Sequence, residues 1–203
     1  LAWTFSYVLP SWERRSLPQV VLRALQALAH YANESLGAAE GAGGADDPRV
    51  GQRLSRRRAY DAIGAVEASF QRSAAEPQRV RVPVGELAAF IDHAQRLMAH
   101  LSVIRLSLSR GRESARAPDV AAEVARTREA LAQCLRVEGG DGPEAGAIDP
   151  LESLPDDREL VDRRAWLLRR LRITVDDARL TAAAARRLLA AGSTSVAGLP
   201  LPR

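Results

Sequence analysis

The chain has 203 residues, a formal net charge of +4 and 46% hydrophobic residues, which suits one domain with a hydrophobic core of its own. Its basic side chains are all arginine and are interspersed with acidic residues. No basic stripe or recognisable nucleic-acid-binding motif accompanies this charge, so the sequence argues against a nucleic-acid partner. The single cysteine, Cys134, excludes an intrachain disulfide and a cysteine-built zinc site.

The chain opens with an apolar, aromatic segment that is followed by two arginines, Arg14 and Arg15. Four of the nine aromatic residues fall in the first twelve positions, namely Trp3, Phe5, Tyr7 and Trp12. Aromatic rings followed by arginine are typical of a transmembrane helix that leaves the bilayer on the cytoplasmic side. Because a complete span needs roughly 20 apolar residues, we expect residues 1–12 to be only the end of such a helix. A buried segment packed on a helical core is the alternative that composition leaves open.

Two amphipathic helices are predicted next. The first starts near Ser16, which can cap it, and ends at Gly37. Its apolar residues are spaced by three and four, at Val21, Leu25, Leu28 and Ala32. The second opens at Asp46-Asp47-Pro48 and ends at Glu76-Pro77. It carries small residues that would let a partner helix approach closely: Ala62, Gly64, Ala65 and Ala68.

The third predicted helix, residues 84–110, has the clearest periodicity in the chain. Its apolar positions are Leu87, Phe90, Ala94, Leu97, Leu101, Ile104 and Leu108, with Ile91 and Met98 beside them. A shorter stripe predicts a fourth helix from Val120 to Cys134, where the thiol is expected to be buried. The fold class is therefore all-α, an antiparallel bundle of about four long helices within residues 13–137.

The remainder of the chain is predicted to be a linker, a C-terminal helical appendage and a tail. Residues 138–155 are interrupted by glycine and proline, which indicates a flexible linker. Residues 156–192 are expected to form two helices, the second launched by a capping box at Thr174-Val175-Asp176-Asp177. Residues 193–203 are expected to be disordered. The sequence does not show whether this appendage docks on the bundle.

The segment Leu9-Pro10-Ser11-Trp12-Glu13-Arg14-Arg15 resembles the one just after the final transmembrane helix in the fusaric acid resistance (FUSC-type) family of bacterial inner-membrane proteins. The stretch from Arg57-Arg58-Ala59-Tyr60-Asp61-Ala62 through Gln71-Arg72 to Glu76-Pro77 is similar to the arginine- and alanine-rich helix that follows it. The resemblance covers about residues 1–110 and consists of helix composition, not of a catalytic signature.

The resemblance implies that the chain is the cytosolic domain of an integral inner-membrane protein, lying on the cytoplasmic side. That family is associated with the efflux of aromatic and other organic acids. The implied role is assembly or regulation of the membrane part and not catalysis. The implied partners are the protein's own transmembrane region and further copies of itself in a homo-oligomer. A free-standing soluble helical protein–protein interaction module is the alternative.

No catalytic, cofactor or metal site is predicted. His93 and His100 lie about 10.5 Å apart along a helix axis, too far to share one zinc ion, so both are expected at the boundary of the bundle. Membrane-proximal contacts are predicted for Trp3, Phe5, Tyr7, Trp12, Arg14 and Arg15. An anionic contact, with a lipid surface or a substrate, is predicted for Arg56, Arg57 and Arg58. A solvated or salt-bridged helix face is the alternative for these three arginines.

Overall fold

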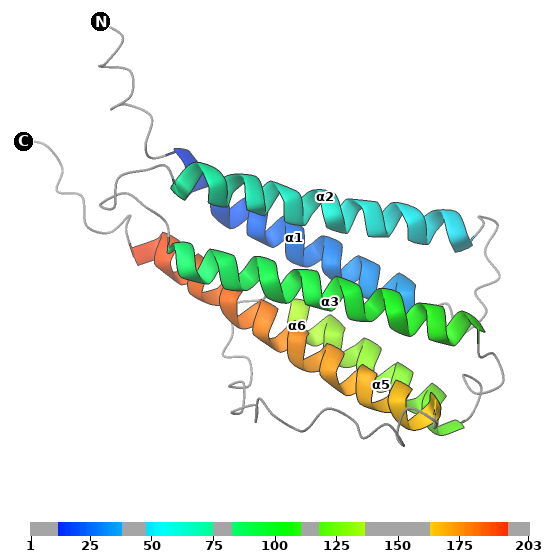
Figure 1. The fold of residues 1–203 in the computed structure, drawn as a ribbon. Coiled ribbons are helices and arrows are strands. Elements are labelled where there is room, and N and C mark those ends of the chain that lie inside the picture. Colours follow the sequence, from blue (N-terminus) through cyan, green and yellow to red (C-terminus); the bar gives the residue numbers. More distant parts are fainter. Residues whose placement is uncertain (1–11, 38–47, 75–82, 111–117, 137–162, 195–203) are drawn as a thin grey trace, which may run out of the picture.

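The computed structural model describes residues 12–37, 48–74, 83–110, 118–136 and 163–194, and these residues form five α-helices. The helices are α1 (Trp12–Gly37), α2 (Pro48–Ala74), α3 (Val84–Arg110), α5 (Pro118–Leu135) and α6 (Arg163–Thr194). No strand occurs in these ranges. The predicted all-α fold is therefore confirmed, and the helices pack side by side as a bundle (Figure 1).

Helix α1 lies at the centre of the bundle, because it packs against each of the other four described helices. α2 covers α1 and touches α3, whereas α6 packs along α3 and α5 (Figure 1). Successive helices run antiparallel except α5 and α6, which run in the same direction. An ion pair between Asp119 and Arg164, each in the first turn of its helix, joins the starts of these two parallel helices.

The hydrophobic core is built from the stripes that the sequence predicts. Along α3 every residue of the predicted stripe is buried, and Met98 joins it as a fully buried side chain. On α1 the four predicted positions are buried together with Leu17, Ala24, Tyr31 and Leu36. Each buried leucine or phenylalanine stabilises the folded chain by about 1.5–3 kcal/mol relative to an exposed one. The apolar face of the central helix is therefore fully used inside the bundle.

The start of α1 differs from the prediction. The helix begins at Trp12, about one turn before Ser16, so Pro18 lies inside it. Pro18 is the seventh residue of α1 and has no N–H, so the helix lacks the hydrogen bond that this residue would otherwise donate to the carbonyl of Arg14. The predicted stop at Gly37 is confirmed. The aromatic run before Trp12 lies outside the described residues.

The two C-terminal helices predicted from the sequence are one continuous helix, so the predicted helix start at Thr174 is wrong. α6 runs without a break from Arg163 to Thr194. Inside it the Thr174 hydroxyl donates to the carbonyl oxygen of Arg170 at 2.7 Å, and Thr181 makes the same bond to Asp177 at 2.7 Å. A threonine hydroxyl satisfied by the preceding turn is compatible with a helix interior, so the cap-like pattern does not end the helix.

The C-terminal region docks on the bundle, which answers the question that the sequence left open. α6 buries Leu167, Leu171, Ala178 and Leu188, and it packs on α3, α5 and α1. Ser193 and Thr194, expected in the tail, are the last residues of α6. The predicted linker 138–155 and the rest of the predicted tail lie outside the described residues.

Candidate functional site

The membrane-proximal residues predicted at the N-terminus are described only in part. Trp3, Phe5 and Tyr7 lie outside the described residues. Trp12, Arg14 and Arg15 belong to the first turn of α1, where the structure describes the backbone alone. The helix that begins at Trp12, α1, packs against each of the other described helices.

The predicted anionic contact on α2 consists of three exposed arginines that do not converge. Arg56 lies over the ring of Tyr60, 5.5 Å from its centroid, and the Arg57 Nε atom lies 3.8 Å from Asp61 Oδ2. Arg58 is exposed as well. Consecutive helical residues are about 100° apart around the axis, so the three guanidinium groups point in different directions. The geometry does not gather them around one anion.

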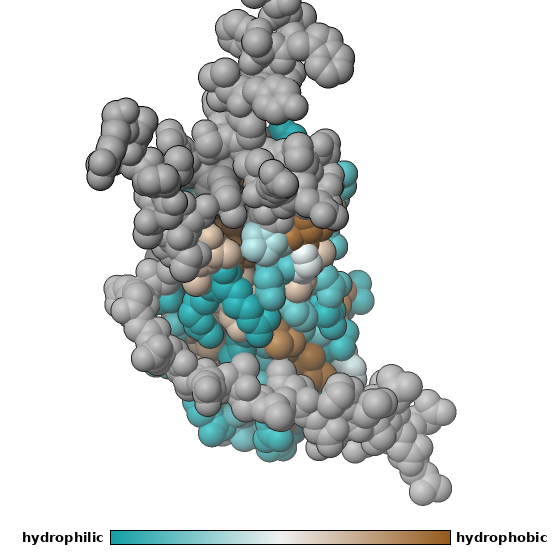
Figure 2. Space-filling model, turned by 90° about the vertical axis from the view of Figure 1, so that its left-hand side faces the viewer, coloured by the Kyte–Doolittle hydropathy of each residue, from teal (hydrophilic) through white to brown (hydrophobic). Residues whose placement is uncertain are grey.

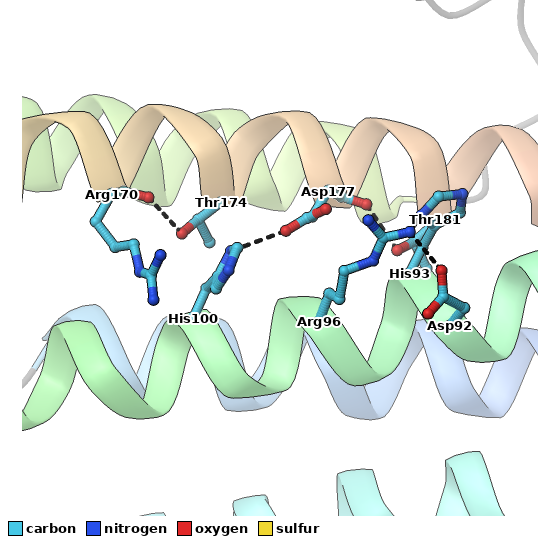
Figure 3. Close-up of polar contacts among 8 residues, drawn as sticks. All are labelled: Asp92, His93, Arg96, His100, Arg170, Thr174, Asp177 and Thr181. Atoms are coloured by element: carbon cyan, nitrogen blue, oxygen red, sulfur yellow. Dashed lines mark hydrogen bonds and ion pairs between the residues drawn. The ribbon is translucent and has the colours of Figure 1, made fainter. Parts of the chain in front are cut away.

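Polar side chains of α3 and α6 face one another where the two helices pack, and one contact between them crosses from helix to helix (Figure 3). His100 Nδ1 on α3 is 2.8 Å from Asp177 Oδ2 on α6, and the two side chains are only 16% and 8% exposed. The two atoms are close but do not have the alignment of a hydrogen bond.

A second group on α3 surrounds His93. Arg96 contacts both Asp92 and the Nδ1 atom of His93, the latter at 3.1 Å (Figure 3). A guanidinium N–H donates, so Nδ1 must accept, which leaves the ring proton on Nε2. Burial lowers the pKa of His93 below its ordinary value of 6.5, and the positive charge of Arg96 lowers it further against the opposing pull of Asp92 and Asp177. His93 is therefore held as a neutral acceptor.

Sequence reasoning placed both histidines at the edge of the bundle, and each is indeed partly buried beside α6. It did not single out Asp177 as a partner, because the residue was assigned to a helix cap. Among the described residues, no group of three or more histidine, cysteine or acidic side chains is placed to hold a metal ion. His100 and Asp177 therefore join α3 and α6 through one largely buried polar contact.

Cys134 on α5 is half-buried. The sequence predicts a buried thiol, so that prediction is confirmed only in part. Desolvation raises the pKa of its thiol, against the opposing effects of Arg179 and Arg186 from α6. A thiol with a raised pKa holds little of the reactive thiolate near neutral pH. Its surroundings are those of a structural cysteine.

Comparison of the chain with known protein families, with curated proteins and with solved structures gave no match. None of the described helices is long and apolar enough to cross a membrane. The assignment to a FUSC-type protein therefore rests on the resemblance of the quoted segments alone.

Proposed function

We propose that this chain is the cytosolic domain of an integral inner-membrane exporter of aromatic or other organic acids. In this proposal the domain serves assembly or regulation of the membrane part and carries no catalytic step. The resemblance at residues 9–15 and 57–77 suggests the family. The observation that carries the proposal furthest is the position of α1, which begins directly after the aromatic run and packs on α2, α3, α5 and α6.

A central first helix suits a domain that must respond to a membrane segment before it. The buried face of α1 includes Leu25, Leu28 and Tyr31, all at most 1% exposed. Close-packed interiors transmit displacement because they leave no space to absorb it. A shift or rotation of α1 driven from its N-terminal end would therefore reach every other described helix. The Tyr31 hydroxyl, 2.9 Å from Ser102 Oγ, adds a polar contact between α1 and α3.

At the end of the bundle where α1 begins, the coloured surface that stays visible in Figure 2 is mainly hydrophilic. Figure 2 shows this end, and its coloured surface carries hydrophilic residues with small, separate groups of hydrophobic ones. Such a surface suits contact with headgroups and water but not with acyl chains. In the proposal, insertion into the bilayer therefore falls to residues 1–11 and not to the described bundle.

Co-sedimentation with anionic vesicles tests the proposal. The intact chain is compared with a deletion of residues 1–11 and with the triple variant Arg56→Gln, Arg57→Gln, Arg58→Gln, whose changes are all at exposed positions. We expect the intact chain and the triple variant to bind and the deletion to lose binding. Binding that survives the deletion but is lost in the triple variant would contradict the proposal, as would an intact chain that stays in the supernatant.

The second candidate function, a free-standing helical interaction module, is favoured by one observation. α2 exposes three large side chains that a solvated helix does not need: Val50, Leu54 and Tyr60. The same sedimentation separates the two functions, because an interaction module has no reason to bind lipid through residues 1–11.

A further inference from the structure

The outer face of α2 carries a regular pattern that the bundle does not use. Its exposed positions at spacings of four and three are Val50, Leu54, Arg57, Asp61, Gly64 and Ala68. The opposite face of α2, with Ala59, Ile63 and Val66, is buried against the bundle. A spacing of 3.5 residues on average is the seam of a two-helix coiled coil. Here the seam faces away from the core.

Two features show that the seam is not explained by the chain's own packing. Val50 and Leu54 are 60% and 45% exposed, although burial of such side chains is favourable. Among the residues that the structure describes, none lies within 4 Å of the position that a Cβ atom on Gly64 would occupy. Glycine inside a helix costs about 1 kcal/mol relative to alanine, and nothing within the bundle requires it. Of the small residues predicted to admit a partner helix, Gly64, Ala65 and Ala68 are exposed, whereas Ala62 packs against the core of the bundle.

We propose that α2 pairs with α2 of a second copy of this chain, antiparallel, about a twofold axis that passes the outer face of α2 at the level of Ala59. In that register Leu54 faces Gly64 of the partner chain, and Val50 faces Ala68 of the partner chain. Each large apolar side chain thus meets a small one. A twofold interface repeats each contact, so the same helix provides both the large and the small residue of each pair.

The charges on α2 favour an antiparallel pair and a second copy of the same helix as the partner. The antiparallel register sets Arg57 opposite Asp61 of the second copy, twice, because of the symmetry. These side chains pair with each other at 3.8 Å within one helix, and at 81% and 72% exposed both are also accessible to a second copy. A parallel pair would instead set Arg57 against Arg57 and Asp61 against Asp61, which is unfavourable.

The flanks of the seam support the same register. Exposed Arg53 would approach Glu67 of the second copy, again an opposite-charge pair, and Tyr60 would approach its symmetry mate across the axis. Arg58 would also approach its own mate, but at the solvated rim, where like charges are screened. A single pair of helices lies at the low end of interface sizes, so the association is expected to be reversible and weak.

This inference does not depend on the proposed membrane role. A dimer of α2 would form equally in a soluble interaction module, and residues 1–11 take no part in it. Its test therefore uses changes on α2 that leave the N-terminus intact, so that self-association through residues 1–11 can be told apart from pairing of α2.

A charge-swap series measured by sedimentation equilibrium tests the pairing. We expect Arg57→Asp alone and Asp61→Arg alone to lower the dimer association constant at least about tenfold, and the double variant Arg57→Asp, Asp61→Arg to restore it. Mixing the two single variants is expected to yield a heterodimer, because one helix is then acidic and the other basic at both positions. Association that is insensitive to the swaps, or a chain that is monomeric at about 1 mM, would overturn the proposal.

Disulfide trapping tests the orientation in a Cys134→Ser background. The double variant Leu54→Cys, Gly64→Cys should form interchain disulfides on mild oxidation, and Leu54→Cys alone should not, because its two copies would lie about 15 Å apart along the axis. Efficient crosslinking of the single variant would indicate a parallel pair and overturn the proposal. Circular dichroism of each variant checks that the helices are retained.

Discussion

His100 Nδ1 on α3 lies 2.8 Å from Asp177 Oδ2 on α6, and both side chains are largely shielded from water. The pair joins the two helices in the middle of their contact, whereas Arg187 and Glu86 join them near the end at 3.2 Å. Removing one partner of a buried polar contact costs more than the contact itself contributes, because the remaining group stays desolvated. The stability of the α3–α6 contact should therefore be sensitive to Asp177.

Asp177→Ala should lower the free energy of unfolding by about 1–3 kcal/mol, since the His100 ring would keep its burial and lose its partner. The neighbouring Asp176 supplies the matched control: it pairs with Arg179 at 3.0 Å on a more exposed surface. Asp176→Ala should cost about 0–1 kcal/mol. Urea unfolding followed by circular dichroism measures both variants. Equal losses of unfolding free energy in the two variants would show that burial of the contact between His100 and Asp177 does not increase its effect on stability.

The pH dependence of stability should contain a contribution from His93. Its pKa is lowered in the folded chain, first by burial and then by Arg96, with Asp92 and Asp177 opposing. Between that lowered pKa and the unfolded value of about 6.5, the unfolded chain binds more protons than the folded chain. The contribution is therefore present above about pH 6.5 and is lost as the pH falls through the folded-state pKa.

His93→Gln should remove this contribution, so the difference in unfolding free energy between the parent chain and the variant should shrink as the pH is lowered below about 6.5. Denaturant unfolding at a series of pH values measures that difference. Gln95→Ala, at an exposed position without a titratable group on the same helix, is the control and should give a difference that does not change with pH. A His93→Gln difference that is constant across the series would rule out the assigned role.

The continuity of α6 at Thr174 can be tested with one proline. If Thr174 were a helix cap, Val175 would be the first helical residue, where proline is well tolerated. In the continuous helix, Val175→Pro should cost about 3 kcal/mol or more, because it removes a hydrogen bond and clashes with the preceding turn. Val175→Ala is the control, because it shortens the side chain but keeps the backbone N–H that proline removes. Similar stabilities for the two variants would favour two separate helices.

The helices with long apolar periodicity were predictable from the sequence, and the polar contacts were not. The stripe from Leu87 to Leu108 is repeated often enough to define α3 and its buried face without tertiary information. At Thr174 only four residues suggested a cap, and their packing against α3 decided otherwise. A pattern of only four residues does not predict a helix start reliably where burial of the neighbouring residues favours continuation of the helix.

Pairings between distant helices need the relative position of those helices, which composition does not give. Asp177 could be recognised as the partner of His100 only once α3 and α6 were known to lie side by side. The small residues Gly64 and Ala68 were noted as a surface for a partner helix, but only the structure shows that no helix of the described bundle covers them. The sequence indicated that surface without indicating its occupant.

The most direct test of a membrane-linked α1 is the depth of Trp3 in vesicles. A chain with Trp12→Phe and Trp166→Phe keeps Trp3 as its only tryptophan. The control, Trp3→Phe with Trp12→Phe, keeps Trp166 in the first turn of α6, at the end of the bundle away from the start of α1 (Figure 1). Anionic vesicles with brominated acyl chains should quench Trp3 and leave Trp166 unchanged. If Trp3 is quenched no more than Trp166, residues 1–11 do not enter the bilayer and the membrane assignment is wrong.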